Sequence, residues 1–185
     1  MDNNTSRPSR RSVLAVFAGI GVAAAAPVYG RAPGFLRRAG NTRRIRMYSQ
    51  RTGDSIDALY YIDGKYIPEV MREVTYFMRD WRQDKMMKYD VQNIDILAAS
   101  SKLMDTSEPY LLISGFRTRQ TNRMLRGAAK DSFHMRAMAA DVRLKGRSVK
   151  QMAGAAQSVN GGGVGVYYRS NFVHMDSGPV RAWRG

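Results

Sequence analysis

Apolar side chains recur at helical spacing in three stretches of the chain, and this periodicity predicts three amphipathic helices. They span residues 67–81, 91–104 and 149–157. Pro68 suits the first turn of the first helix, where the N–H that proline lacks would have no partner. Residues 119–126 show a weaker pattern, which indicates a short helix or a turn.

Shorter apolar runs and alternating apolar and polar positions predict β-strands. The predicted strands are residues 47–50, 55–62, 110–114, 139–144, 164–168 and 172–175. The glycine run at residues 161–163 predicts a hinge or tight turn before the fifth of them. Together these elements predict an α+β fold, with a small, mainly antiparallel sheet flanked by helices.

The beginning of the chain has the pattern of an export signal, over residues 1–30. Arg10-Arg11 resembles the arginine pair of the twin-arginine export motif. The apolar run over residues 13–26 is shorter than the roughly 20 residues that span a bilayer. The general secretory route and an uncleaved membrane anchor are the alternatives. Residues 31–46 are basic and predict an unstructured linker, so residues 47–185 are the predicted folded domain.

Charge and composition narrow the classes of protein that these elements fit. The 185 residues carry a formal net charge of +15, which favours a polyanionic partner such as nucleic acid, an anionic membrane or an acidic cell-wall polymer. A soluble basic surface without a dedicated partner is the alternative. The chain has no cysteine, which excludes disulfides, cysteine-ligated zinc and a cysteine nucleophile.

The two histidines of the chain each have an aspartate nearby in the sequence. His134 lies in a loop before Asp141, which begins a predicted strand, and His174 lies in another predicted strand. A catalytic zinc ion takes three ligands from His, Asp or Glu and leaves a fourth position for water. The sequence therefore predicts that His134, Asp141 and His174 bind zinc. Two solvent-facing His–Asp pairs are the alternative.

Candidates for the other chemical roles lie close to the predicted ligands. His174 and Asp176 are two positions apart in a strand, so their side chains point to the same face. Asp176 is the predicted general base, and Asp131 is a second candidate. The reverse assignment, with Asp176 on the metal and His174 as the base, stays open. Arg117 follows a strand end, where its guanidinium can bind a substrate carboxylate through two hydrogen bonds.

Several blocks of the sequence resemble one family of zinc peptidases. The spacing Ser132-x-His134-x6-Asp141 resembles the first zinc motif of the D-Ala-D-Ala carboxypeptidase and murein endopeptidase superfamily. Ser-Gly-Phe-Arg at residues 114–117 resembles its Ser-Gly-Tyr-Arg segment. The closing block at residues 172–183 resembles a branch of exported murein endopeptidases.

The resemblance implies roles for the matching residues. It implies that His134, Asp141 and His174 bind zinc and that Arg117 contacts the substrate, and we expect Ser132 to support the site by hydrogen bonding. Two departures matter. Ala137 replaces the usual Gly of the first motif, and the acidic or histidine residue that many members place just before the last His is absent.

We therefore expect an exported, zinc-dependent peptidase of the periplasm or cell envelope that hydrolyses peptide cross-links of peptidoglycan, with residues 47–185 as its catalytic domain. A non-catalytic peptidoglycan-binding or scaffold protein with the same fold is the alternative. Nucleic acid is not an expected partner, because the sequence has an export signal and no recognisable binding motif. Stable membrane insertion after signal cleavage is not expected either. The sequence leaves open the oligomeric state and the bond cut, which is D-Ala–diaminopimelate, diaminopimelate–diaminopimelate or L-Ala–D-Glu.

Overall fold

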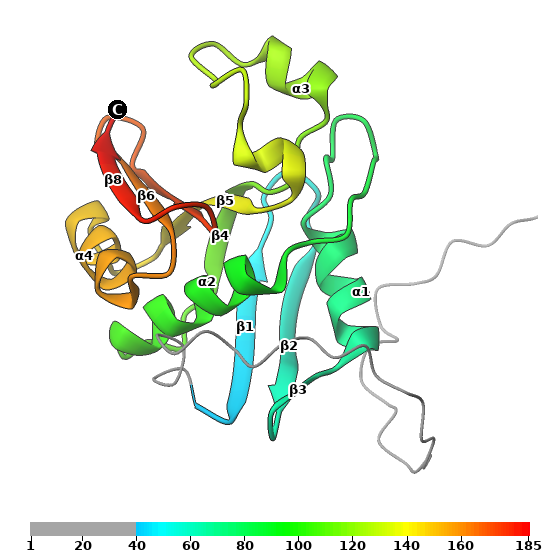
Figure 1. Cartoon of the computed structure of the whole chain (residues 1–185), viewed down its shortest axis with the longest axis vertical. Coiled ribbons are helices and arrows are strands. Elements are labelled where there is room, and N and C mark those ends of the chain that lie inside the picture. Colours follow the sequence, from blue (N-terminus) through cyan, green and yellow to red (C-terminus); the bar gives the residue numbers. More distant parts are fainter. Residues whose placement is uncertain (1–39) are drawn as a thin grey trace, which may run out of the picture. The chain divides into compact units, whose positions relative to one another are not determined.

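The computed structural model describes residues 40–185, which form an α+β fold around one mixed sheet (Figure 1). The strands are Thr42–Tyr48 (β1), Ser55–Ile62 (β2), Lys65–Tyr66 (β3), Tyr110–Ser114 (β4), Ala139–Leu144 (β5), Gly163–Tyr167 (β6), Phe172–Asp176 (β7) and Arg181–Arg184 (β8). The helices are Pro68–Phe77 (α1), Val91–Leu103 (α2), Arg119–Met124 (α3) and Val149–Val159 (α4), with a 3₁₀ helix at Phe133–Arg136 (η2).

The eight strands follow the order β3-β2-β1-β4-β5-β7-β6-β8. Strands β1 and β4 pair in parallel, and so do β6 and β8, whereas the other neighbours pair antiparallel. The sheet is therefore mixed and larger than the small sheet that the sequence predicted. Strand β4 returns to the sheet after two helices, and a long connection of this kind allows a parallel pairing.

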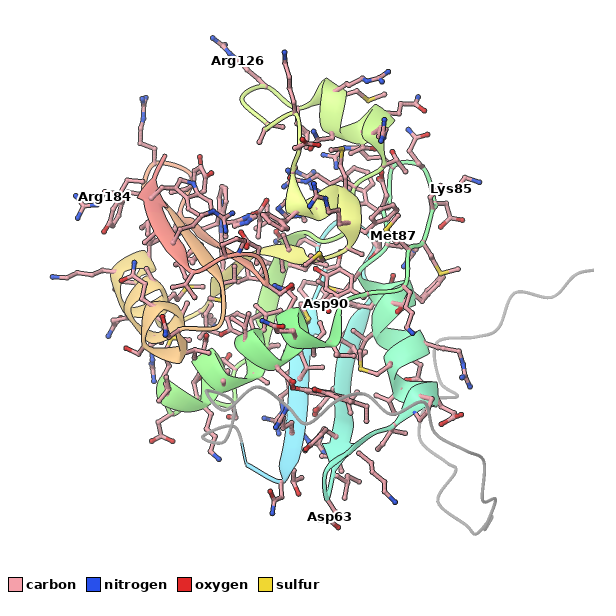
Figure 2. All side chains as sticks on the ribbon, in the orientation of Figure 1. Asp63, Lys85, Met87, Asp90, Arg126 and Arg184 are labelled. Carbon is pink, nitrogen blue, oxygen red and sulfur yellow. The ribbon has the colours of Figure 1, made fainter. Side chains whose placement is uncertain are left out.

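Helices α2 and α4 contact each other, and both also contact strands of the sheet, while α1 contacts β2. Figure 1 shows α2 running across the strands with α4 beside it. Apolar side chains from both layers, such as Ile94 and Leu97 of α2 and Val142 and Met175 of the sheet, are buried in the core. Charged side chains such as Lys85, Arg126 and Arg184 project away from the ribbon (Figure 2).

The helix predicted over residues 67–81 ends at Phe77. Contacts with distant residues explain the early end, because the Phe116 N–H donates to the Met78 carbonyl. Two residues after Met78, the Asp80 carboxylate accepts hydrogen bonds from the backbone N–H groups of Arg82 and Thr118. These hydrogen bonds stabilise a loop in place of the last helical turn. Apolar periodicity could not predict them, because their partners are distant in the sequence.

The basic segment predicted as a linker over residues 31–46 ends earlier than expected, because β1 begins at Thr42. Arg43 is buried in this strand and pairs with Asp95 of α2, so its charge is part of the core. The predicted export signal and the first part of the predicted linker lie outside the described residues. Within residues 40–185, no helix is long and apolar enough to cross a membrane.

Candidate active site

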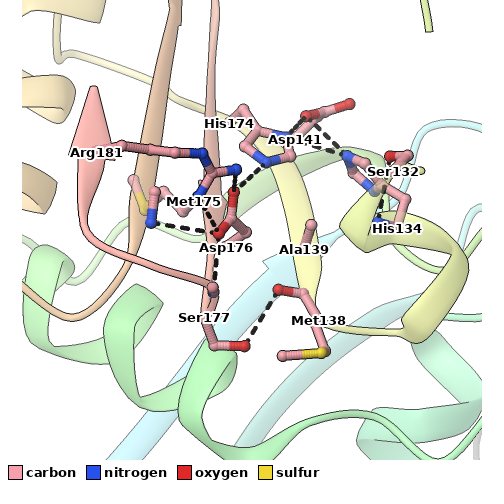
Figure 3. Close-up of polar contacts among 12 residues, drawn as sticks. Ser132, His134, Met138, Ala139, Asp141, His174, Met175, Asp176, Ser177 and Arg181 are labelled. Carbon is pink, nitrogen blue, oxygen red and sulfur yellow. Dashed lines mark hydrogen bonds and ion pairs between the residues drawn. The ribbon is translucent and has the colours of Figure 1, made fainter. Parts of the chain in front are cut away.

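The three predicted ligands, His134, Asp141 and His174, meet in the structure (Figure 3). They come from η2, β5 and β7, and the pairing of β5 with β7 sets Asp141 directly opposite His174. Asp141 Oδ1 lies 3.1 Å from His134 Nε2 and 2.8 Å from His174 Nδ1. The two ring nitrogens lie 3.2 Å apart. All three side chains are buried, so the alternative of solvent-facing pairs is wrong.

Hydrogen bonds on the far sides of the two rings define which nitrogen faces the cluster as an acceptor. His134 Nδ1 lies 2.7 Å from the Gly115 carbonyl oxygen, to which only an N–H can donate. His174 Nε2 lies 2.9 Å from Asp176 Oδ2, and donates in the same way. In the neutral rings, His134 Nε2 and His174 Nδ1 therefore carry lone pairs. Two lone pairs and a carboxylate oxygen converge on one point, which is an arrangement that a cation stabilises.

The spacing of these three atoms fits zinc. With zinc–nitrogen and zinc–oxygen bonds of about 2.0–2.1 Å, ligands of a tetrahedral ion lie about 3.3 Å apart. The observed separations of 2.8–3.2 Å need only a slight opening of the cluster. Two histidines and one carboxylate also match the donor set of catalytic zinc sites, in which the fourth position is open.

The pKa shifts of the cluster residues arise from burial and from the contacts among them. Burial lowers the pKa of His134, so its ring is neutral at pH 7, as metal binding requires. Burial would raise the pKa of Asp141, but its contacts with His134 and His174 hold that pKa well below its usual range. Burial likewise opposes the charging of His174, yet hydrogen bonds with Asp141 and Asp176 raise its pKa.

Arg117 and Ser132 both lie beside the cluster and line the cleft. The Arg117 guanidinium contacts Asp141 Oδ2, and its Nε donates to Ser114 Oγ at 2.7 Å. Ser132 caps η2 by accepting the His134 backbone N–H at 3.3 Å. Arg117 thus faces the second oxygen of a predicted ligand, and Ser132 shapes the turn that carries His134.

The prediction that Asp176 is the general base does not fit its surroundings. Asp176 is fully buried, and both carboxylate oxygens accept hydrogen bonds. It lies behind His174, and it is not among the residues that line the cleft over the cluster. Burial would raise the pKa of Asp176, but His174 and Arg181 lower it well below its usual range. A carboxylate without a free lone pair or access to the cleft cannot take a proton from water there.

Sequence reasoning missed three contributors to the site: the Gly115 carbonyl, Gly163 and Arg181. A Cβ atom at Gly115 would lie 2.5 Å from the Met78 carbonyl oxygen, and one at Gly163 would lie 2.6 Å from Asp176 Oδ2. Gly161 and Gly162 form a bend, as predicted, whereas Gly163 already belongs to β6 and allows close approach. The glycines themselves were the available signal, but the neighbours that require them are distant in the sequence.

The backbone conformation of Ala137 explains why the related first zinc motif usually has glycine at this position. It ends η2 in the left-handed conformation, with φ of 54°, which costs an L-residue roughly 1–2 kcal/mol. Its methyl group is fully buried, and this burial offsets part of the cost. The chain therefore keeps the loop after His134 with alanine in a backbone conformation that favours glycine.

A cleft of about 620 Å³ opens over the cluster. Its basic side chains are Arg117, Arg126 and Arg181, and its aromatic side chains are Phe133, Tyr167, Phe172 and Trp183. The carboxylates that line it are those of Asp131 and Asp141. A cleft with guanidinium groups beside a cation site suits a substrate that carries carboxylates.

A buried cluster of two histidines and an aspartate at the base of an open cleft is the arrangement of a metallopeptidase site. Comparison with known proteins agrees, because residues 37–183 match the family described as peptidoglycan L,D-endopeptidase MepK. The chain belongs to this family, which confirms the resemblance to the murein endopeptidase branch.

Two relatives show how far the similarity extends. Peptidoglycan L,D-endopeptidase MepK of Escherichia coli strain K12 is 39% identical over 145 residues, which cover 76% of this chain and 80% of that protein. Probable peptidoglycan L,D-endopeptidase MepK of Haemophilus influenzae is 32% identical over 139 residues, which cover 72% of this chain and 75% of that protein.

Proposed function

We propose that this protein is a zinc-dependent peptidoglycan L,D-endopeptidase. The observation that carries the proposal is the convergence of His134 Nε2, His174 Nδ1 and Asp141 Oδ1 at the base of the cleft. Membership of a family described by this activity supports the same substrate. The fold, the site and the family thus agree on hydrolysis of a peptide bond in peptidoglycan.

An L,D-endopeptidase cuts a bond between an L-centre and a D-centre, and this excludes one of the three peptide bonds that the sequence left open. A D-Ala–diaminopimelate link joins two D-centres, so it is not an L,D bond. A diaminopimelate–diaminopimelate cross-link and the L-Ala–D-Glu bond each join the carbonyl of an L-centre to the nitrogen of a D-centre. Both have free carboxylates nearby, which fits the guanidinium groups of the cleft. We therefore propose one of these two bonds as the target.

The side chains of the site would have separate roles in hydrolysis, namely metal binding and substrate binding. A zinc ion bound at the cluster would polarise the scissile carbonyl and lower the pKa of its bound water towards ~7. His134, Asp141 and His174 would hold that ion. Arg117, at the edge of the cluster, would bind a substrate carboxylate and so place the scissile bond.

Asp131 is the carboxylate of the cleft that remains for proton transfer, because Asp141 belongs to the cluster. Replacing it by asparagine should lower kcat by about 10²–10⁴-fold, the usual contribution of a general base, while zinc binding stays unchanged. Steady-state cleavage of a purified muropeptide across a range of pH measures this. An Asp131→Asn enzyme with the original kcat and the original acidic limb of the pH profile would show that another group accepts the proton.

The place of action follows from the substrate. Peptidoglycan lies outside the cytoplasmic membrane, so we propose that residues 1–30 direct export to the periplasm or cell envelope. The net charge of +15 would hold the enzyme near the carboxylates of the wall. A twin-arginine route stays a prediction from the arginine pair.

Digestion of purified sacculi with the zinc-loaded chain tests the proposed function. We expect mass analysis to show loss of cross-linked dimers with a matching rise in monomers if the diaminopimelate–diaminopimelate link is cut. Release of stem peptides that keep D-Glu at their amino end would instead identify the L-Ala–D-Glu bond. Sacculi that bind zinc-loaded protein and stay intact would favour the non-catalytic alternative.

A further inference from the structure

Asp176 does not line the cleft, yet hydrogen bonds fix the position of both its carboxylate oxygens. Its Oδ1 accepts from the Gly163 N–H at 3.3 Å, the Gly178 N–H at 2.9 Å and Arg181 at 3.0 Å. Its Oδ2 accepts from Arg181 at 2.7 Å and lies 2.9 Å from His174 Nε2 (Figure 3). Burying a carboxylate is costly unless all its lone pairs are used, and here all of them are.

The backbone at Gly163 leaves space for both the Asp176 carboxylate and the Arg181 guanidinium. Strand β8 runs parallel to β6 and sets Arg181 opposite Gly163. A Cβ atom at Gly163 would lie 2.6 Å from Asp176 Oδ2 and 2.2 Å from an Arg181 nitrogen, so a larger residue there would displace this pair. The Arg181 guanidinium also lies 5.1 Å from the Phe133 ring centroid and 4.8 Å from that of Trp183. These cation–π contacts help to hold the Arg181 side chain.

The hydrogen bond between Asp176 and His174 connects this carboxylate to the cluster. His174 uses Nε2 to donate to Asp176 and points Nδ1 at the cluster. If Nε2 lost its acceptor, the proton could move to Nδ1, and the ring could turn. Either change would remove one of the three converging acceptors. A carboxylate behind a histidine ligand is known to fix the ring's tautomer and orientation and to raise its basicity.

We propose that Asp176 is a positioning residue that fixes His174 with Nδ1 towards the cluster, and that Arg181 of β8 holds Asp176 in that role. This inference rests on the proposed zinc-dependent function. It assigns a role to the short last strand, which neither the motif spacing nor the family description supplies. It also replaces the predicted role of Asp176 as general base, and it makes Arg181 part of the support of the site.

The test compares zinc affinity in four proteins: the wild type, Asp176→Asn, Arg181→Gln and Arg184→Gln. Arg184 is the matched control, because it lies on the same strand and projects away from the fold (Figure 2). Affinity is measured by competition with a chromophoric chelator, and thermal unfolding shows which variants are folded. Loss of a partner behind a ligand typically weakens metal binding by about 10–100-fold. We expect that loss for Asp176→Asn, a smaller loss for Arg181→Gln, and none for Arg184→Gln.

Cleavage of muropeptides at saturating zinc separates the two roles of Asp176. A positioning residue predicts that excess zinc restores most of the Asp176→Asn activity and that the acidic limb of the pH profile is retained. Unchanged zinc affinity with activity lost even at saturating zinc would overturn the proposal and restore the base. If Asp176→Asn does not fold, Arg181→Gln decides, and wild-type affinity in that variant would overturn the role of Arg181. A wild type that binds no zinc would instead contradict the proposed function itself.

Discussion

Replacing His134 by alanine should abolish stoichiometric zinc binding and lower the cleavage of peptidoglycan by at least about 10³-fold, because a Lewis-acidic metal contributes several kcal/mol to such reactions. The His134 side chain is 2% exposed and supplies one of the three converging acceptors. Without it, His174 and Asp141 are left as two ligands beside a buried gap. Zinc content measured by mass spectrometry, together with product analysis of digested sacculi, checks both parts.

Two further variants separate loss of the ligand from loss of the fold. Met135→Ala alters the next residue of η2 without removing a member of the cluster, so zinc content and activity should stay near the wild-type values. Asp141→Asn keeps the shape of its side chain but removes a charge, so it should also lose zinc. A His134→Ala protein that keeps one zinc ion with the original affinity would show that the metal binds elsewhere.

The meeting of His134, Asp141 and His174 could be predicted from the sequence, because two of them lie in predicted strands and the third follows a loop. Period-two alternation set the side chains of His174 and Asp176 on one face, and the structure brings them into contact. The same alternation could not tell which side of His174 faces the cleft. That depends on the register of β7 between β5 and β6, which pairs Asp176 with Ala139 and Gly163 inside the sheet.

The errors in the fold have a similar origin. The sequence located β2, β4 and β5 because their apolar side chains are continuous or alternate. It missed β8, which is short and mostly polar, and it assigned the first part of β1 to a linker because that segment is rich in arginine. Arg43 is buried with a partner from α2, and no local pattern distinguishes such an arginine from a solvated one.

Replacing Asp95 by alanine should destabilise the protein by about 3–5 kcal/mol, the usual cost of removing one partner of a buried ion pair. Asp95 Oδ2 lies 2.7 Å from Arg43 Nη1, and the side chains are 0% and 4% exposed. The hydroxyl groups of Tyr60 and Tyr66 also donate to this carboxylate. The substitution would leave a buried guanidinium without its counter-charge. Urea unfolding followed by circular dichroism measures the change in the free energy of unfolding.

Asp57 provides the matched control, because it pairs with Arg44 at 2.6 Å on the next strand, yet the two side chains are 54% and 45% exposed. Exposed pairs of this kind contribute roughly 0–1 kcal/mol, so Asp57→Ala should change stability far less than Asp95→Ala. Equal losses in the two variants would contradict the role given to burial. A larger loss at Asp95 would show that its buried carboxylate, which binds Arg43 of β1 and the hydroxyls of Tyr60 and Tyr66, stabilises the folded domain.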